Sequence, residues 1–448
     1  MDLKLPQDII AFMDTIRKNG FEVYVVGGAV RNLLLKKDVT NWDFTTNATP
    51  EDIQKLFPDN FYHNVYGTVT VKKDENLFEI TPFRKESHYT DNRHPEKIEW
   101  AKTLAEDLGR RDFTINAMAL RLAPLAQGKL DYEIIDLFNG QKHLEEKKIA
   151  AVGNPDTRFQ EDALRLMRGI RFASQLGFLI ADETRNAMQR NANLIKNISW
   201  ERIRDELLKI MGSDHPSEGI LFLKGTEILK YILPELDSCF AVPQKSPNRH
   251  HIYDVGTHLV MALKNCPSKD PITRFAALMH DIGKVGTFHK DEKSELITFY
   301  NHEVVGTIQA KKIADRLRLS NEQKEKFVRL IEFHQFTVIE DQTDKAVRRF
   351  IRDVGKEYIQ DMLDVRTADR IGSGATPTSW RLDLFKKRII EVQKEPFTVK
   401  DLKINGLDVM KIKNIKPSRE VGDILDALFE KVINGEVKNE REELLKNI

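Results

Sequence analysis

The stretch VVGGAVR, residues 25–31, places two glycines where a predicted strand meets a predicted helix. Residues 21–26 are mostly β-branched or aromatic, which is typical of a short strand. Glycines at such a turn let the backbone approach a phosphate closely, and the N-terminus of the next helix adds positive potential. A glycine pair alone is more often an ordinary strand–helix turn, so its interpretation depends on the residues that follow.

The stretch NWDFTT, residues 41–46, follows this turn. Residues two apart on a strand point to the same face, so Asn41 and Asp43 are expected to lie side by side. Carboxylates at both positions would hold two divalent ions for in-line phosphoryl transfer, but only position 43 is a carboxylate. Glu79, on a strand predicted at 77–82, is the candidate for another carboxylate from a neighbouring strand.

The first 140 residues have mixed α/β character, and the rest is almost wholly helical. A helix is predicted at 8–18, and a hairpin from strands 66–72 and 77–82 with its turn at 73–76. Apolar residues at helical spacing recur in 160–178, 201–212, 256–265, 272–281, 303–316 and 320–334. The chain of 448 residues is too long for one core, which predicts two to four domains.

Composition restricts the possible partners and location. The chain has 70 Lys and Arg against 69 Asp and Glu, so any basic RNA-binding surface must be local. Cys239 and Cys266 cannot form a disulfide framework, which favours a reducing cytoplasm. The N-terminus lacks the pattern of a signal peptide, and no apolar stretch approaches the roughly 20 residues of a membrane helix. We therefore expect a cytoplasmic protein without a membrane partner.

A second group of polar residues lies in residues 158–178, RFQEDALRLMRGIRFASQLGF. On a helix, Asp162 and Arg165 share a face, and Arg168 extends the row. An isolated pair of this kind is usually a solvated salt bridge. Cytosine and adenine, however, both present an amino donor beside a ring-nitrogen acceptor. An ionised Asp with an Arg would therefore accept both bases, while guanine and uracil would leave buried charges unpaired.

A third group begins with the adjacent residues His280 and Asp281, which follow an apolar helical run. Their side chains can both reach one cation. Further possible ligands stand at helix-like positions: His258, His302, His334 and Asp369. Each histidine alone is as often a core or capping residue as a ligand, but the set predicts a metal site inside a helical bundle.

Taken in order, several motifs resemble the class II CCA-adding enzyme and bacterial poly(A) polymerase family. They are residues 27–31, Asp43, residues 47–50, Tyr66-Gly67-Thr68-Val69, residues 79–84, Arg93-His94-Pro95, residues 107–117, 135–140 and 161–165. Residues 198–207 resemble the family's neck motif, with Ser199 as the expected N-cap of a helix. So many motifs in order are far more specific than a lone glycine pair.

The resemblance implies an α+β fold. A polymerase beta-like nucleotidyltransferase head with a mixed sheet is expected at 1–140, followed by an all-α neck and body at 141–248. An HD module would occupy 249–375 and a helical tail 376–448. The implied activity is template-independent addition of CCA to the 3′ end of tRNA from CTP and ATP with Mg²⁺, the acceptor arm and elbow of the tRNA being bound.

The resemblance also assigns residues. Mg²⁺ would be held by Asp43 and Glu79, with Asn41 at a place where the family has aspartate. Nucleotide binding is implied for Gly27, Gly28, Arg31, Arg110, Arg111, Asp112, Asn116, Asp162, Arg165 and Arg168. The set around His280 resembles the HD superfamily of metal-dependent phosphohydrolases. There the first His, the His-Asp pair and the last Asp hold one metal, either a divalent transition metal or Mg²⁺, and extra histidines allow a second.

Two departures leave alternatives open. Asn41 replaces a metal-binding aspartate, and Asn32 replaces a usual aspartate after Arg31. An amide oxygen can ligate a hard cation but brings no charge. Besides a CCA-adding enzyme, the chain could be a poly(A) polymerase or A-adding enzyme, which share the head motifs. It could also be a tRNA-binding protein with an inactive head whose only chemistry is at the HD site, and Asn41 is the one feature that favours this alternative. The HD module either hydrolyses phosphomonoesters or 2′,3′-cyclic phosphates or only supports the body. The sequence does not indicate the oligomeric state.

Overall fold

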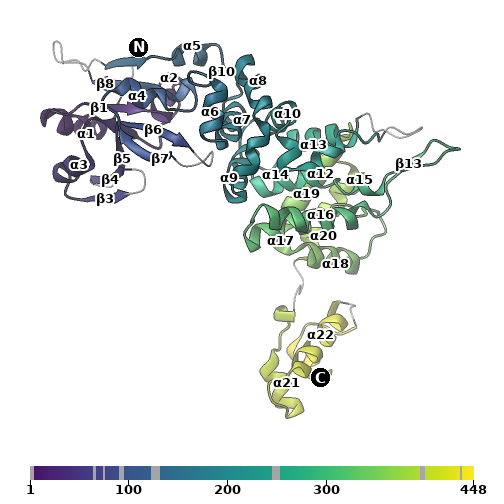
Figure 1. Cartoon of the computed structure of the whole chain (residues 1–448). Helices are drawn as coiled ribbons and strands as arrows, with labels where there is room; N and C mark the ends of the chain where they lie inside the picture. Colours follow the sequence, from purple (N-terminus) through teal and green to yellow (C-terminus); the bar gives the residue numbers. More distant parts are fainter. Residues whose placement is uncertain are drawn as a thin grey trace. The chain divides into compact units, whose positions relative to one another are not determined.

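The structure is a computed structural model (Figure 1) that describes residues 5–63, 67–73, 76–89, 95–122, 132–244, 253–393, 399–433 and 436–448. The chain divides into two compact units, residues 1–240 with 313–319, and residues 241–312 with 320–448. The finer boundaries at 140, 248 and 375 stay predictions. Tyr66, turn residues 74 and 75, Arg93, His94 and the boundary at 248 lie outside the described residues.

A seven-stranded mixed sheet forms the N-terminal part of the first unit, in the order β3-β4-β5-β2-β1-β8-β9. Its strands are β1 Val23–Val26, β2 Asp43–Thr46, β3 Asn60–His63, β4 Thr68–Lys73, β5 Asn76–Pro82, β8 Met118–Leu122 and β9 Tyr132–Asp136. A separate hairpin joins β6 Arg84–Tyr89 to β7 Pro95–Trp100. The predicted strands at 21–26, 66–72 and 77–82 are confirmed as β1, β4 and β5, with shifted ends.

Strand pairing puts Asp43 at the edge of the glycine turn. In β2, Asp43 lies opposite Val26 of antiparallel β1 and opposite Glu79 of parallel β5. β1 ends at Val26, so the residues before Asp43 have no partner on that side, and β2 begins at Asp43. The expectation that Asn41 shares a strand face with Asp43 is therefore wrong, because Asn41 precedes the strand and is exposed.

Aromatic side chains join the sheet to its covering helix. Helix α1 Gln7–Lys18 confirms the predicted helix at 8–18. It buries Phe12 against Phe44 of β2 and Phe78 of β5, with ring centroids 4.8 and 4.7 Å apart. Burying each such side chain stabilises the fold by about 1.5–3 kcal/mol. This packing holds β2 and β5, and with them Asp43 and Glu79, in register.

The remaining elements of the first unit are mostly helices. They are α2 Gly28–Leu34, α3 Pro50–Leu56, α4 Leu104–Gly109, α5 Gly140–Glu145, α6 Pro155–Glu161, α7 Leu164–Leu176, α8 Asp182–Arg190, α9 Trp200–Met211, α10 Pro216–Gly225, α11 Leu229–Ile232, α12 Pro234–Cys239, and the parallel pair β10 Lys148–Ile149 and β11 Leu179–Ile180. Ser199 precedes α9 as predicted, but its side chain makes no capping hydrogen bond.

The helix predicted over 160–178 is broken into α6 and α7. Asp162 has extended backbone angles (φ −139°, ψ 105°), and its Oδ1 accepts a hydrogen bond from the backbone N–H of Leu164 at 3.0 Å. An aspartate that bonds a nearby backbone N–H competes with helix continuation. The expectation that Asp162 and Arg165 share one helix face is therefore wrong, because the break lies between them.

The second unit is almost wholly helical. Its elements are α13 Val255–Lys264, α14 Pro271–Met279, α15 Lys284–Thr287, α16 His302–Arg316 (whose last turn belongs to the first unit), α17 Asn321–Glu332, α18 Asp344–Val354, α19 Ile359–Gly372, α20 Trp380–Val392, α21 Gly406–Lys413, α22 Arg419–Ile433, α23 Arg441–Lys446, β12 His289–Lys290 and β13 Ile297–Thr298. The helices predicted within 256–334 are confirmed, with shifted ends.

Capping aspartates begin the helices that surround the second unit's core. Asp254 and Asp270 accept backbone N–H groups at the starts of α13 and α14. Phe275 of α14 stacks on Phe327 of α17 with ring centroids 4.6 Å apart.

A mixed-sheet head followed by helices confirms the predicted α+β class. None of the described helices has both the length and the apolar character needed to cross a bilayer.

Candidate functional site

One cavity of about 440 Å³ in the first unit collects most of the predicted head residues. Its lining consists of Gly27, Gly28, Arg31, Asp43, Arg84, Arg110, Arg111, Asp112, Asn116, Asp162, Leu164, Arg165, Arg168, Phe172 and Arg202. Seven arginines face three aspartates, so the wall carries a net positive charge that suits a polyphosphate. Asn41 and Glu79 do not line it. Arg84, Phe172 and Arg202 do line it, and they stand in stretches quoted from the sequence without an individual role having been assigned to them.

The glycine turn lets two charged side chains approach the backbone. Gly27 has φ +69°, a conformation that other residues rarely adopt. A Cβ atom there would lie 3.2 Å from Nη1 of Arg111 and 3.8 Å from Oδ2 of Asp43. The turn therefore brings bare backbone, a guanidinium and a carboxylate together at one end of the cavity.

Two carboxylates face each other across neighbouring strands. Burial raises the pKa of Asp43, the negative charge of Glu79 raises it further, and Arg111 opposes both effects. Two such carboxylates repel each other unless a cation lies between them. Oxygen ligands on adjacent strands fit Mg²⁺. Asn41, just before β2, can add only a neutral oxygen.

A buried carboxylate fixes two arginines of the cavity wall. Asp107 is 0% exposed, and its Oδ1 accepts hydrogen bonds from Nε and Nη2 of Arg110 at 3.0 and 2.8 Å. Its Oδ2 accepts from Nη2 of Arg111 at 3.2 Å. Burial alone would raise the pKa of Asp107, but the two guanidinium groups outweigh it and hold that pKa below its usual value. The sequence motif contains Asp107 but does not reveal this positioning role.

A polar chain holds further cationic groups in place. Nη1 of Arg31 donates to Oδ1 of Asn116 at 2.7 Å, and Nε of Arg168 donates to Oδ2 of Asp112 at 2.7 Å. Both guanidinium groups also lie over the ring of Phe172, 5.4 and 5.5 Å from its centroid. These contacts immobilise positive charge along one wall before any ligand binds.

The two candidate base-selecting residues reach the cavity from opposite sides of the helix break. Oδ2 of Asp162 pairs with Nη2 of Arg202 at 3.3 Å. Arg165 is buried, and its guanidinium donates to Oε2 of Glu161 at 2.5 Å and to the carbonyl of Arg110 at 3.1 Å. A carboxylate and a guanidinium are thus both fixed at the wall of one cavity, as base selection requires.

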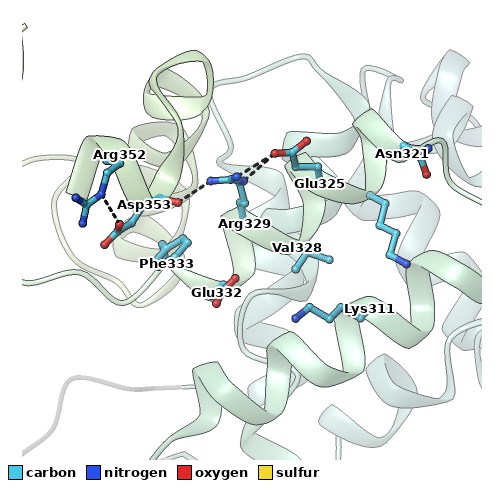
Figure 2. Close-up of a pocket in the computed structure, with 10 residues that line it drawn as sticks. Lys311, Asn321, Glu325, Val328, Arg329, Glu332, Phe333, Arg352 and Asp353 are labelled. Carbon is cyan, nitrogen blue, oxygen red and sulfur yellow. Dashed lines mark hydrogen bonds and ion pairs between the residues drawn. The ribbon is translucent and has the colours of Figure 1, made fainter. Parts of the chain in front are cut away.

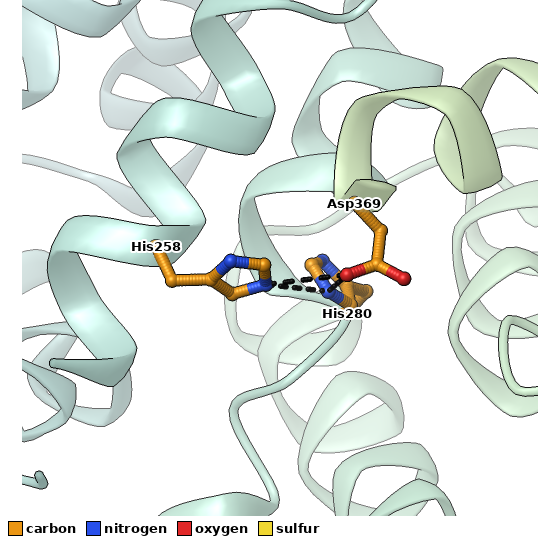
Figure 3. A group of neighbouring side chains, drawn as sticks. All are labelled: His258, His280 and Asp369. Atoms are coloured by element: carbon orange, nitrogen blue, oxygen red, sulfur yellow. Dashed lines mark hydrogen bonds and ion pairs between the residues drawn. The ribbon is translucent and has the colours of Figure 1, made fainter. Parts of the chain in front are cut away.

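The structure brings together all six predicted metal ligands of the second unit. They form two groups, in each of which the ligand atoms lie within 4.8 Å of one another. The first group is His258, His280 and Asp369, and the second is Asp281, His302 and His334. Figure 3 shows the first group, with one oxygen of the Asp369 carboxylate directed at both imidazoles.

Asp281 lies between the two groups. Its Oδ2 is 3.3 Å from Nε2 of both His258 and His280. Its Oδ1 is 3.1 Å from Nε2 of His302 and 3.6 Å from Nε2 of His334. One carboxylate therefore presents an oxygen to each group, which is the arrangement of a bridging ligand.

Backbone carbonyls orient the imidazoles. Nδ1 of His280, His302 and His334 contacts the carbonyls of Ala277, Phe299 and Ile331 at 2.8, 2.9 and 2.6 Å. A carbonyl can only accept, so Nδ1 carries a proton and Nε2 is the nitrogen that faces the shared centre, where a metal would replace any proton that it carries. This is the tautomer that binds a metal.

The electrostatics of the cluster favour cations. Burial would lower the pKa of His280, but Asp281 and Asp369 outweigh it and raise that pKa to about 10. The pKa values of both aspartates lie well below their usual range, because cationic partners (His280 for both, and Lys284 for Asp281) outweigh burial. Buried carboxylates with such low pKa values, placed among imidazoles, fit divalent cations, because a bound cation replaces the protons at such sites.

A larger hollow of about 730 Å³ in the second unit contains none of the predicted site residues. Figure 2 shows that some of its charges are paired. Arg329 donates to Glu325 at 3.1 Å and to the carbonyl of Asp353 at 2.8 Å, and Arg352 pairs with the Asp353 carboxylate. Surface ion pairs of this kind contribute little to stability.

Three family models match the chain. The poly A polymerase head domain matches residues 23–150, and a probable RNA and SrmB-binding site of polymerase A matches residues 177–240. A putative tRNA nucleotidyltransferase domain 2 matches residues 288–448.

Similar proteins span nearly the whole chain. The CCA-adding enzyme of Ligilactobacillus salivarius is 30% identical over 98% of this chain and 95% of its own. The CCA-adding enzyme of Lactococcus lactis subsp. cremoris is 30% identical over 99% of this chain and 97% of its own. The crystal structure of the Bacillus stearothermophilus CCA-adding enzyme in complex with CTP has a TM-score of 0.72 and 26% identity, covering 98% of this chain and 95% of that one. The Thermotoga maritima CCA-adding enzyme complexed with tRNA has a TM-score of 0.61 at 21% identity, a similarity of fold alone.

Proposed function

The chain belongs to the CCA-adding enzyme family, and from this premise we propose that its first unit adds CCA to the 3′ end of tRNA from CTP and ATP. One observation carries the proposal: a single cavity joins the Asp43 end, suited to phosphoryl transfer, to the Asp162 and Arg165 end, suited to base selection. The acceptor arm would reach this cavity, and the tail at 376–448 would bind the tRNA elbow. A tRNA substrate also favours the cytoplasm.

The proposed transfer site is built from Asp43 and Glu79, which would hold Mg²⁺ together with the neutral oxygen of Asn41. A divalent ion held there would supply activation of the RNA 3′-hydroxyl and neutralisation of the leaving pyrophosphate. The arginines that Asp107 fixes, together with Arg31, bind the triphosphate. Because these groups are immobilised in advance, little reorganisation is needed as charge develops.

Base selection is proposed for Asp162 and Arg165. The carboxylate accepts from the amino group of cytosine or adenine, and the guanidinium donates to the neighbouring ring nitrogen. Guanine and uracil present these groups in the opposite order, so they would place a carbonyl oxygen against the carboxylate and a ring N–H against the guanidinium. The same two residues thus accept both nucleotides of CCA and reject the other two.

Asp162→Ala is expected to lower the rate of addition from both CTP and ATP by about 10- to 100-fold, the loss of one hydrogen bond to a charged group. Misaddition from GTP and UTP should rise relative to correct addition. Gels at single-nucleotide resolution with each nucleotide alone measure both effects. Asp156→Ala, on α6 outside the cavity lining, is the matched control. Unchanged kinetics with CTP and ATP would refute the assignment.

Asn41→Asp is expected to lower the Mg²⁺ concentration for half-maximal addition by about three- to tenfold, because it adds a negative charge beside Asp43. The assay uses tRNA transcripts ending at the discriminator base. We expect the native chain to add three nucleotides. Addition by the variant alone would show that position 41 inactivates the native head. Addition by neither would contradict the transferase assignment, and extension with ATP alone would favour an A-adding enzyme.

We also propose a second activity in the second unit, metal-dependent hydrolysis of phosphate esters. It is supported by the convergence of six ligands on two groups that share Asp281. Four imidazoles favour a divalent transition metal such as Mn²⁺, Co²⁺ or Ni²⁺ over Mg²⁺. Phosphomonoesters and 2′,3′-cyclic phosphates are the expected substrates. Turnover of p-nitrophenyl phosphate and 2′,3′-cAMP by the metal-loaded chain tests this, and no turnover with any of these metals would leave the module a supporting role.

A further inference from the structure

We propose that Gln244 and Lys284 form an oxyanion-binding pair beside the metal ligands of the second unit, and that this pair receives a phosphoryl oxygen of the bound ester. The inference rests on the proposed phosphoesterase function and deepens it. It names a binding element outside the six ligands.

Lys284 is a buried ammonium in direct contact with the metal-binding cluster. It begins α15 and is only 8% exposed. Its Nζ lies 2.6 Å from Oδ2 of Asp281 and donates to Oε1 of Gln244 at 2.7 Å. The ring of Phe299 lies beneath it, 5.3 Å from the ring centroid. An ammonium has three N–H donors, and the described residues offer it two hydrogen-bond acceptors.

Gln244, which contacts Lys284, carries a side-chain hydrogen-bond donor without a partner among the described residues. Its side chain is 2% exposed, and Nε2 has no hydrogen-bond partner among the described residues. Lys284 can only donate, so the amide oxygen must face it and the amide nitrogen must face elsewhere. Leaving such a donor unpaired in the interior costs about 1–3 kcal/mol, so native structures rarely keep one without a partner from the protein, water or a ligand.

The chemistry of the pair selects an anionic oxygen. Both groups offer donors that cannot accept, and one group is positively charged. Lys284 contacts the carboxylate that faces both metal-binding groups, and Gln244 is held beside Lys284. A phosphoryl group has several non-bridging oxygens. Metal ions can take some of them while fixed donors take another, and such preorganised donors stabilise the charge that develops in the transition state.

The test uses the full-length chain loaded with Mn²⁺, with inorganic phosphate as the probe. The affinity for phosphate is measured by isothermal titration calorimetry for the native chain, Gln244→Met and Gln244→Glu. Gln360→Met, an exposed glutamine on α19, is the matched control. We expect phosphate affinity to fall about tenfold in Gln244→Met and further in Gln244→Glu, whose carboxylate repels the anion. Manganese content and tRNA extension should stay unchanged, and the KM for p-nitrophenyl phosphate should rise in parallel.

If both variants retain manganese and bind phosphate as tightly as the native chain does, the inference is overturned. So would loss of manganese in both, because the pair would then only support the ligands. Should Gln244→Met not fold, Gln244→Glu keeps the side-chain length and the contact to Lys284 and decides alone. If the native chain hydrolyses no ester but Gln244 still controls phosphate binding, the phosphoesterase function fails while the anion site stands.

Discussion

Asp43→Asn is expected to lower the rate of nucleotide addition by at least about a thousandfold, because a metal-binding carboxylate contributes several kcal/mol of transition-state stabilisation. Asp43 is the one carboxylate at the junction of the glycine turn and the strand pair with Glu79. Since Asn41 is already neutral, the variant leaves Glu79 as the only charged ligand proposed for Mg²⁺. Single-turnover extension of a tRNA transcript measures the effect.

The same variant separates chemistry from folding. Burial and Glu79 raise the pKa of Asp43, so its ionised form opposes folding when no cation is bound. Metal-free Asp43→Asn should therefore unfold at a higher temperature than the native chain near neutral pH. That difference should disappear as the pH falls through the raised pKa and the native carboxyl becomes protonated. Asp38→Asn, at an exposed position before β2, is the control. Addition at the native rate by Asp43→Asn would remove Asp43 from the mechanism.

Asp281→Asn is expected to abolish stable metal binding at both groups of the second unit and to lower ester hydrolysis by at least about a thousandfold. The reason is geometric, since each oxygen of Asp281 faces a different group of ligands. The variant also removes the negative partner of Lys284, so we expect the second unit to be less stable. Metal content after dialysis against Mn²⁺ is the direct measurement.

Extension of tRNA provides the complementary readout for Asp281→Asn. We expect it to stay at the native rate, because the nucleotide cavity is built entirely from residues of the first unit. Asp291→Asn, in an exposed turn of the same unit, is the matched control. Full retention of manganese by Asp281→Asn would refute the shared-ligand arrangement.

Periodicity predicted the elements, and residue identity predicted the metal ligands of the second unit, whereas most of the head site came from the resemblance to a known family. Apolar spacing located helices such as α1 and α17, because each buries one face in a core. The six ligands could be named because few residue types bind metals and each stood at a helix-like position. The resemblance implied a first metal held by His258, His280, Asp281 and Asp369 and a second through the extra histidines. That the two oxygens of Asp281 face different groups could not be predicted, because it depends on how α13, α16 and α19 pack.

The failures of prediction have local and long-range causes. Periodicity does not register the competition of the Asp162 carboxylate for a backbone N–H, so one helix was expected where there are two. The position of Asn41 depends on where β1 ends, which is a property of another strand. Arg202 reaches Asp162 from 40 residues away, and no spacing rule for helices or strands connects such positions.

The break between α6 and α7 bears on the proposal that one pair of side chains serves two bases. Asp162 sits in extended backbone between the two helices. Its N–H donates to the carbonyl of Arg158 at 3.5 Å, and its carbonyl accepts from the N–H of Arg165 at 3.0 Å, so the residue is tied to the end of one helix and to the start of the next. Arg165 is anchored in the first turn of α7. Under the proposed base selection, we expect that a small displacement of α6 relative to α7 would change the distance between the carboxylate and the guanidinium.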